Sequence, residues 1–270
     1  MRLRLYGPNI LYNGDLERGD VSSWGLYYNA SSGALADLSV STAAPYRGNY
    51  EMFVDVKSFS ARADNIQVYQ QNVRVLLGVP TAVRFAGRAE VDWSTRVNYL
   101  LGMSPYTLYY YGYSSLTTAY QQFEHTFTMA ADVNSGSIRF YCGSGGVTPE
   151  DIYLDEISLR HYIDLPVGYD YARAEVLQRH DARALGGALH TYIEPNGYRR
   201  FTLPLTHVTS AERSLLNAWW LKGEEVHFVE DNTAVFSFWR TRIVGNEEPI
   251  TKNVQPYHDQ FAGELVLETI

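Results

Sequence analysis

Residues 65–75, NIQVYQQNVRV, decide the fold class, because apolar and polar side chains alternate along them. Successive side chains of a β-strand point to opposite faces, so Ile66 and Val68 share one face while Gln67 and Tyr69 share the other. One face packs in a core and the other meets water. Similar short segments, separated by Gly, Pro, Asn and Ser, occur at residues 34–43, 49–58, 81–93, 124–131 and 137–143. This succession of strands and turns predicts a β-sandwich.

The alternating pattern ends after residues 153–162, YLDEISLRHY, where Pro166 and Gly168 interrupt the chain. We therefore place a domain boundary near Leu165. The first domain comprises residues 1–165. The second, residues 166–270, is predicted to be smaller, with strand-like segments around one helix.

The helix of the second domain has clear start and stop signals. Thr209 and Glu212 have the spacing of a capping box, and the apolar run that follows stops at Gly223. The sequence predicts a helix from about Ser210 to Leu221.

Length and composition exclude several classes of protein. The chain has 270 residues, 46% of them hydrophobic, and a net charge of -8. Such a chain can bury a full core and is not disordered. It has no apolar run of about 18 residues and no basic cluster, so we expect neither a membrane span nor nucleic-acid binding. The N-terminus lacks the features of a signal peptide, and the single Cys142 predicts a buried thiol without a disulfide.

Catalytic motifs are missing from the sequence, so we predict that the chain is not an enzyme. Adjacent carboxylates on a strand point to opposite faces, which is not the geometry of a glycosidase pair. Such adjacent carboxylates occur at Glu150-Asp151, Asp155-Glu156 and Glu224-Glu225. The seven histidines show no metal-binding spacing, and residues 143–146, GSGG, are neither a nucleophile elbow nor a phosphate loop.

Tyrosine is unusually abundant, with 22 Tyr against 11 Phe, and 17 of the tyrosines lie at or before Tyr162. Aromatic rings stack on the C–H faces of sugars, and amides bind sugar hydroxyls, so this composition suits a glycan-binding surface. Tyr and Trp also dominate protein–protein interfaces, which is the competing use. The candidate glycan-binding residues are Trp24, Tyr28, Tyr69, Gln71, Trp93, Tyr99, Tyr109 and Tyr111.

The opening residues 9–27, NILYNGDLERGDVSSWGLY, resemble the start of carbohydrate-binding modules of the family 4/9/22 type. Residues 48–50, GNY, and 152–159, IYLDEISL, match a middle and a final strand of these modules. The resemblance implies a jelly-roll β-sandwich for the N-terminal domain. It also implies a structural Ca²⁺ held by Glu17 and Asp155; alternatively, these two carboxylates only bind backbone amides at the seam of the sandwich.

The C-terminal residues 197–231 and 240–270 resemble domains of tail and baseplate proteins of tailed bacteriophages. This resemblance implies a mainly β chain in which the jelly roll is followed by a smaller β-sandwich or split barrel with one α-helix. Such domains assemble into rings. Adjacent tryptophans on a helix point about 100° apart, so we expect Trp219, Trp220 and Trp239 to include an assembly contact; alternatively, the helix is buried on a wide face.

Together these features predict a structural component of a tailed-phage virion that displays a glycan-binding sandwich. Its expected partners are other virion proteins, copies of itself and a host cell-surface glycan. Its expected location is the virion tail, after synthesis in the bacterial host cytoplasm. Two alternatives stay open: a free soluble glycan-binding protein, and a carbohydrate-active enzyme with a catalytic domain at residues 166–270.

Overall fold

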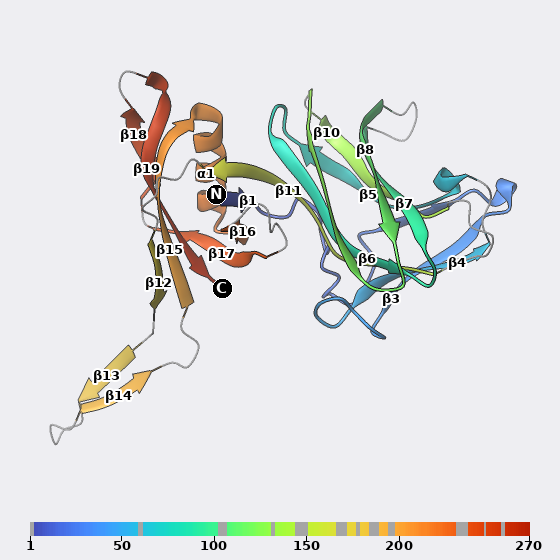
Figure 1. The fold of residues 1–270 in the computed structure, drawn as a ribbon, viewed down its shortest axis with the longest axis horizontal. Helices are drawn as coiled ribbons and strands as arrows, with labels where there is room; N and C mark the ends of the chain where they lie inside the picture. The colour runs from blue at the N-terminus through green and yellow to red at the C-terminus, as the bar shows by residue number, and fades with distance from the viewer. Residues whose placement is uncertain are drawn as a thin grey trace. The chain divides into compact units, whose positions relative to one another are not determined.

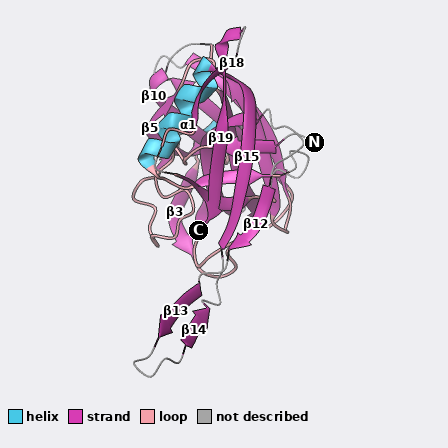
Figure 2. Ribbon diagram, turned by 90° about the vertical axis from the view of Figure 1, so that its left-hand side faces the viewer, coloured by secondary structure: helices cyan, strands magenta, loops and turns pink. Residues whose placement is uncertain are grey.

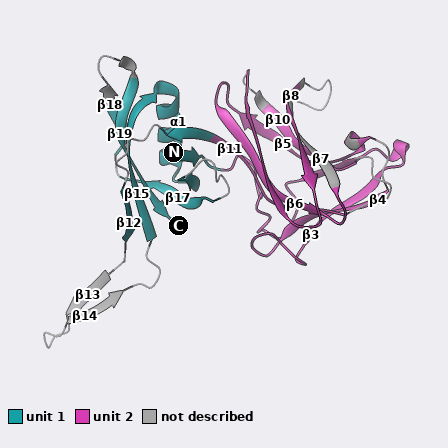
Figure 3. Ribbon diagram, in the orientation of Figure 1, with its two compact units in different colours: residues 1–8, 162–270 teal, residues 9–161 magenta. Residues whose placement is uncertain are grey.

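The computed structural model of the chain (Figure 1) is mainly β and forms two compact units, Asn9–His161 and Met1–Pro8 with Tyr162–Ile270 (Figure 3). Among the described residues, no helix is long and apolar enough to cross a membrane. The structure describes residues 3–58, 62–101, 107–130, 133–143, 151–165, 172–176, 179–183, 189–193, 198–230, 237–245, 247–254 and 257–270.

The unit Asn9–His161 is a sandwich of two antiparallel five-stranded sheets. One sheet has the order β3-β4-β11-β6-β9, and the other has the order β2-β5-β10-β7-β8. The strands of the first sheet are β3 (Leu35–Ser41), β4 (Glu51–Ser58), β6 (Pro80–Ala89), β9 (Gln121–Thr128) and β11 (Ile152–Leu165). Those of the second are β2 (Gly25–Tyr28), β5 (Ile66–Val75), β7 (Trp93–Leu101), β8 (Thr107–Leu116) and β10 (Val133–Tyr141). The predicted jelly-roll class of sandwich is confirmed.

The core of this sandwich lies between the two sheets and follows the predicted alternation. Ile66 and Val68 of β5 are fully buried there, together with Phe140 of β10 and Leu154 of β11. At about 25 cal/mol per Å² of buried apolar surface, each such side chain contributes about 1.5–3 kcal/mol to folding. Cys142 belongs to the same core, as predicted, and burial raises the pKa of its thiol to about 12.

The other unit is built on one antiparallel sheet with the order β12-β15-β19-β17-β16-β1-β11, to which β11 contributes its last residues. A further strand, β18, pairs with β19, and β13 and β14 pair with each other. The strands are β1 (Leu3–Tyr6), β12 (Ala172–Val176), β13 (Arg179–Arg183), β14 (Leu189–Ile193), β15 (Tyr198–Thr209), β16 (Val226–Val229), β17 (Trp239–Val244), β18 (Ile250–Val254) and β19 (Tyr257–Thr269).

The two units differ from the predicted domains in the placement of the first eight residues. Strand β1 lies between β11 and β16, with Leu5 opposite both Ile163 and Phe228. Residues 1–8 therefore belong to the same unit as Tyr162–Ile270 and not to the sandwich. A four-residue strand has too few positions for its pairing partner to be evident from its own alternation, and the partners here are more than 150 residues away in sequence.

The predicted helix is confirmed as α1 (Ser210–Lys222), which is drawn in cyan in Figure 2. Thr209 and Glu212 form the capping box, and Gly223 ends the helix with a left-handed φ of 61°. Leu216 and Trp219 are the buried residues of the helix and belong to the core of this unit.

Candidate functional site

Cross-strand registers align two rows of residues on the outer face of the sheet β2-β5-β10-β7-β8. Directly opposite residues of antiparallel strands share a face, so each row can be followed from strand to strand. The first row is Tyr27, Gln67, Tyr141, Arg96 and Tyr113, and the second is Gly25, Tyr69, Arg139, Asn98 and Tyr111. Arg96 and Asn98 are placed by their backbone register alone. We call this surface the tyrosine–amide face.

Arg139 lies at the centre of the tyrosine–amide face and is only 1% exposed. Its Nε donates to Ser137 Oγ at 3.0 Å, and its Nη1 donates to Gln67 Oε1 at 2.6 Å. Its guanidinium carbon lies 5.4 Å from the centre of the Tyr69 ring. Gln67 Nε2 in turn donates to the carbonyl of Asp64 at 2.6 Å. Because both ends of the Gln67 amide are engaged, its orientation is fixed.

Tyr69 lies over the backbone of β2, at a position that requires glycine. A Cβ atom on Gly25 would lie 2.5 Å from Cζ of Tyr69, well inside van der Waals contact. The absence of a side chain at Gly25 therefore lets the Tyr69 ring occupy the space above this strand.

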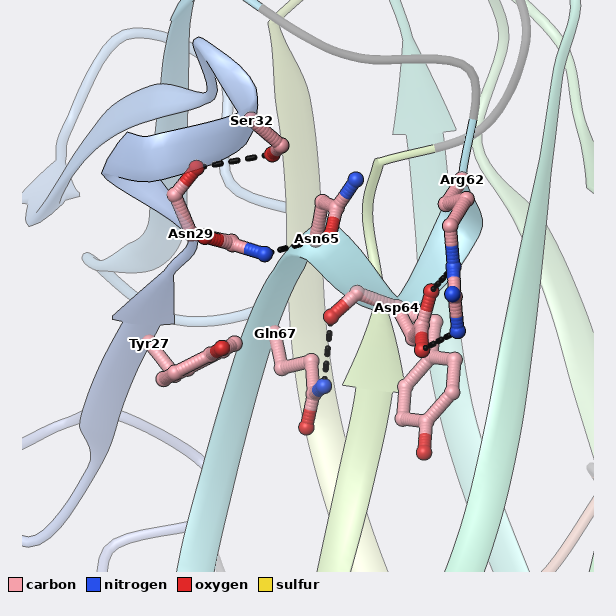
Figure 4. A pocket seen from close by; sticks show the side chains of 8 residues that line it. Tyr27, Asn29, Ser32, Arg62, Asp64, Asn65 and Gln67 are labelled. Carbon is pink, nitrogen blue, oxygen red and sulfur yellow. Dashed lines mark hydrogen bonds and ion pairs between the residues drawn. The ribbon is translucent and has the colours of Figure 1, made fainter.

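A pocket of about 420 Å³ opens beside the first row (Figure 4). Two short 3-10 helices contribute to it, η1 (Ala30–Ser32) and η2 (Ala63–Asn65). The lining combines two phenols, three amides, a hydroxyl and one ion pair. The lining residues are Tyr27, Asn29, Ser32, Arg62, Asp64, Asn65, Gln67 and Tyr141.

Hydrogen bonds within the lining hold its polar groups in place. Asn29 Nδ2 donates to Asn65 Oδ1 at 3.3 Å, and Ser32 Oγ donates to the Asn29 carbonyl at 2.8 Å. Arg62 binds the Asp64 carboxylate through two bonds of 3.0 and 2.8 Å, and the pair lies together on one side of the pocket in Figure 4. These contacts leave a preorganised set of amide, hydroxyl and aromatic groups.

The structure separates the predicted glycan-binding residues into three groups. Tyr69, Gln71 and Tyr111 lie on the tyrosine–amide face, with Tyr111 54% exposed, and Tyr28 is 39% exposed at the end of β2. Trp24 is instead a core residue. The side chains of the remaining three predictions, Trp93, Tyr99 and Tyr109, lie outside the described residues.

Trp24 does not present its ring to the surface. It is 6% exposed, its ring lies 6.3 Å from that of Phe140, and its Nε1 donates to the Asn13 carbonyl at 3.3 Å. Packing against the core decides its direction, and the sequence around it contains no repeat from which that direction could be inferred.

Tyr27, Gln67 and Tyr141 line the pocket although they are not among the predicted glycan-binding residues. Tyr27 and Tyr141 both pair in register with Gln67. The alternation in residues 65–75 does indicate that Gln67 lies on the outer face of its strand. Its neighbours across the sheet depend on a pairing that the sequence does not show.

Glu17, one of the two predicted calcium ligands, binds the loop between β3 and β4. Its Oε1 accepts from the backbone N–H groups of Asn49 at 2.8 Å and Tyr50 at 3.2 Å, and its Oε2 accepts from Asn49 Nδ2 at 3.0 Å. Partial burial acts to raise the pKa of Glu17, but these hydrogen bonds lower it overall. A Cβ atom on Gly48, which has a φ of 74°, would lie 2.2 Å from this carboxylate.

Asp155, the other predicted ligand, is fully buried and binds the same loop. It accepts from the backbone N–H of Arg47 at 2.9 Å and from that of Glu156 at 2.6 Å, and burial raises its pKa to about 7. Calcium takes six to eight oxygen ligands. The described residues contain no group of three or more His, Cys, Asp or Glu that could hold a metal ion. In this structure both carboxylates bind backbone amides, as the alternative describes, and the calcium site stays a prediction.

The three tryptophans predicted at an assembly interface all contact the core of their own unit. Trp219 is 5% exposed, and Trp220 and Trp239 are partly buried against the same core. Trp220 Nε1 donates to the Gly245 carbonyl at 3.1 Å, and Trp239 Nε1 donates to Glu230 at 2.9 Å. Leu216 and Trp219 are the buried residues of the helix, and the assembly contact of the three tryptophans stays a prediction.

Comparison with known proteins gives likenesses of fold for little more than half of the chain. No family model matches the chain, and no curated protein matches it. A solved structure described as "CBM4 structure and function" is 21% identical, with a TM-score of 0.48, and covers 56% of this chain and 99% of its own. The N-terminal cellulose-binding domain of Cellulomonas fimi β-1,4-glucanase C is 20% identical, with a TM-score of 0.41, and covers 53% and 91%. The enzymatically active domain of bacteriophage CBA120 tailspike protein 4 is 10% identical, with a TM-score of 0.44, and covers 57% and 21%.

Proposed function

We propose that the sandwich of residues 9–161 binds a glycan on its tyrosine–amide face, without catalysis. The observation that supports this most directly is the pocket, because it brings Tyr27 and Tyr141 together with the amides of Asn29, Asn65 and Gln67. Phenol rings stack on the C–H faces of a sugar, and amides accept from and donate to its hydroxyls. A volume of about 420 Å³ is within the range of small-ligand sites.

The rows of the tyrosine–amide face extend this site beyond the pocket. Tyr113 ends the row that begins with Tyr27, and it is 62% exposed. Its ring centre lies 6.0 Å from that of Tyr111, the last residue of the second row. Aromatic surfaces at both ends of a five-stranded sheet can contact successive sugars of one chain.

Preorganisation favours binding in this site. The Gln67 amide is held by Arg139 and by the Asp64 carbonyl, so it loses little conformational entropy when a ligand binds. Fixed amide orientation also gives specificity, because a hydroxyl in the wrong position leaves a polar group unsatisfied.

Tyr27→Ala tests the proposal, and Tyr46→Ala is the matched control. Tyr27 is 42% exposed in the pocket, whereas Tyr46 is 40% exposed in the loop between β3 and β4 of the other sheet. Affinity electrophoresis against soluble β-glucan, xylan, mannan and bacterial O-polysaccharide identifies a bound polymer, and calorimetry gives its Kd. Removing an aromatic contact of about 1–3 kcal/mol should weaken binding about 5- to 150-fold in Tyr27→Ala and leave Tyr46→Ala unchanged. Equal binding by both variants would reject the proposal. So would the absence of binding to every polymer when the concentration of its binding sites is in the millimolar range.

We further propose that the unit containing Tyr162–Ile270 attaches the sandwich to a tailed-phage particle, with other virion proteins as partners. The resemblance of residues 197–231 and 240–270 to tail and baseplate domains supports this attachment. Several copies in one particle would raise the avidity of a weak glycan site. Antibody labelling of purified particles of a phage that encodes this chain tests the location: label on the tail supports it, and unlabelled particles favour the free glycan-binding protein.

A further inference from the structure

Strand β12 (Ala172–Val176) lies at one end of its sheet and exposes both of its faces. It pairs with β15 on one side, and no other described strand pairs with it. The first four residues of β12 are exposed and Val176 is half-buried. Ala172 and Ala174 carry only methyl side chains, so the backbone of this edge is accessible. An accessible edge is a template for pairing with another strand.

The charges of β12 are ordered along one face. Arg173 and Glu175 are two residues apart and therefore point to the same side of the sheet. Glu175 lies opposite Arg199 of β15, with 3.3 Å between its Oε1 and Arg199 Nε. The side chains of Arg173 and Glu175 are 41% and 71% exposed, so both can form further ion pairs at the edge.

Trp239 supports this charged face from below. The guanidinium carbons of Arg199 and Arg173 lie 4.3 and 5.3 Å from the centre of its ring, and Arg173 Nη1 lies 3.5 Å from Glu230 Oε2. Cation–π contacts of this kind orient a guanidinium without neutralising it. Arg173 is thus held over the sheet next to the open edge.

We propose that β12 pairs antiparallel with β12 of a second copy of this chain, about a two-fold axis at Ala174. In that register Arg173 of each copy lies opposite Glu175 of the other, and the two Ala174 residues face each other. Glu175 then lies between two arginines, Arg199 on β15 of its own chain and Arg173 on β12 of the second copy, so the charges alternate from strand to strand. This self-complementarity makes a second copy the occupant, because a two-fold interface requires one surface to match itself.

Parallel pairing in register would place Arg173 beside Arg173 and Glu175 beside Glu175, and like charges directly opposite are unfavourable. The antiparallel arrangement closes after two copies and yields a dimer. It uses no residue of the glycan pocket, so the two proposals fail or hold independently.

Charge reversal tests the register on the full chain. Sedimentation equilibrium over a concentration series should show a wild-type dimer, and R173E or E175R alone should raise its Kd at least tenfold. Mixing the two single variants should restore association to within about threefold of wild type, because the mixed pair is again complementary. Circular dichroism and Tm show that each variant is folded. A wild-type monomer at all concentrations, single variants that dimerise normally, or mixing without recovery would each overturn the proposal.

A disulfide test does not depend on reversing any charge. Ala174→Cys places two thiols opposite each other, and facing strand residues have Cα atoms about 4.5–5.5 Å apart, within disulfide range. Mild oxidation with copper phenanthroline should therefore give a covalent dimer. Ala172→Cys is the matched control, because two copies of position 172 would lie about 13 Å apart along the strands. Equal cross-linking of both variants, or none in Ala174→Cys, would overturn the register.

Discussion

Replacing Gly7 with alanine should destabilise the unit that contains α1, because Gly7 lies directly against Trp219. A Cβ atom on Gly7 would lie 2.4, 2.5 and 2.7 Å from Cε2, Cζ2 and Nε1 of this ring. Carbon atoms pack at about 3.5–4.0 Å, so the ring or the backbone must move by roughly 1 Å. The ring is rigid and 5% exposed, so it cannot rotate into solvent.

The expected size of this effect combines two opposing terms. Overpacking of a core costs about 1–3 kcal/mol of stability. Replacing glycine also lowers the conformational entropy of the unfolded chain, which offsets about 0.4–1 kcal/mol of that cost. The net destabilisation of Gly7→Ala should be about 1–2 kcal/mol. A double-mutant cycle with Trp219→Phe isolates the contact, because the smaller ring creates the space that the new methyl group needs.

Denaturant unfolding followed by tryptophan fluorescence measures this cycle. Three of the five tryptophans lie in this unit, at positions 219, 220 and 239, so its transition dominates the signal. In the Trp219→Phe background, Gly7→Ala should cost less than half of what it costs in the wild type. A Gly7→Ala variant as stable as the wild type, or two additive effects, would refute the close contact.

Three other perturbations follow from the structure. A fragment of residues 166–270 should fail to fold by circular dichroism, because it lacks β1 and the end of β11; a cooperative unfolding transition in the fragment would contradict this. Burial lowers the pKa of His161 from 6.5 to about 4, so the unfolded state binds a proton first as the pH falls. The His161 contribution to stability is present above pH 6.5 and should decrease towards pH 4 by at most about 3 kcal/mol, while the raised pKa of Asp155 acts in the opposite direction over the same range. The difference between wild type and His161→Gln in urea titrations at each pH isolates the His161 contribution. Calcium and EDTA should give the same Tm within about 1 °C, since backbone amides already bind Glu17 and Asp155; a calcium-dependent rise of several degrees would support the predicted metal site instead.

Local signals in the sequence were sufficient for some of the elements, whereas strands such as β1 and β8 were not predicted. The alternation in residues 65–75 identified β5 and the direction of Ile66 and Val68, because a two-residue period reports one buried face. Thr209, Glu212 and Gly223 located both ends of α1, because a helix end is decided by a few adjacent residues. These interactions act over short distances along the chain, and a single sequence therefore contains them.

The candidate site depends on pairings between distant residues. Gln67, Tyr27 and Tyr141 meet only because β5 pairs with β2 and β10 in particular registers, and a shift of one residue would turn each strand over. The direction of Trp24 also depends on a distant residue. Its ring packs in the core beside Phe140, which lies 116 positions later in the sequence.

The sequence alone determined the mainly β class, the helix α1 with its caps, and the concentration of tyrosines in the N-terminal half. The tertiary structure decided which of those side chains form a pocket, which tryptophans are buried, and that β1 completes the sheet containing the C-terminal strands. The physical reason is that a strand is favoured by the local alternation of its own residues. Which strands pair, and in which register, depends instead on contacts between residues far apart in the sequence, and these contacts exist only in the folded sheets.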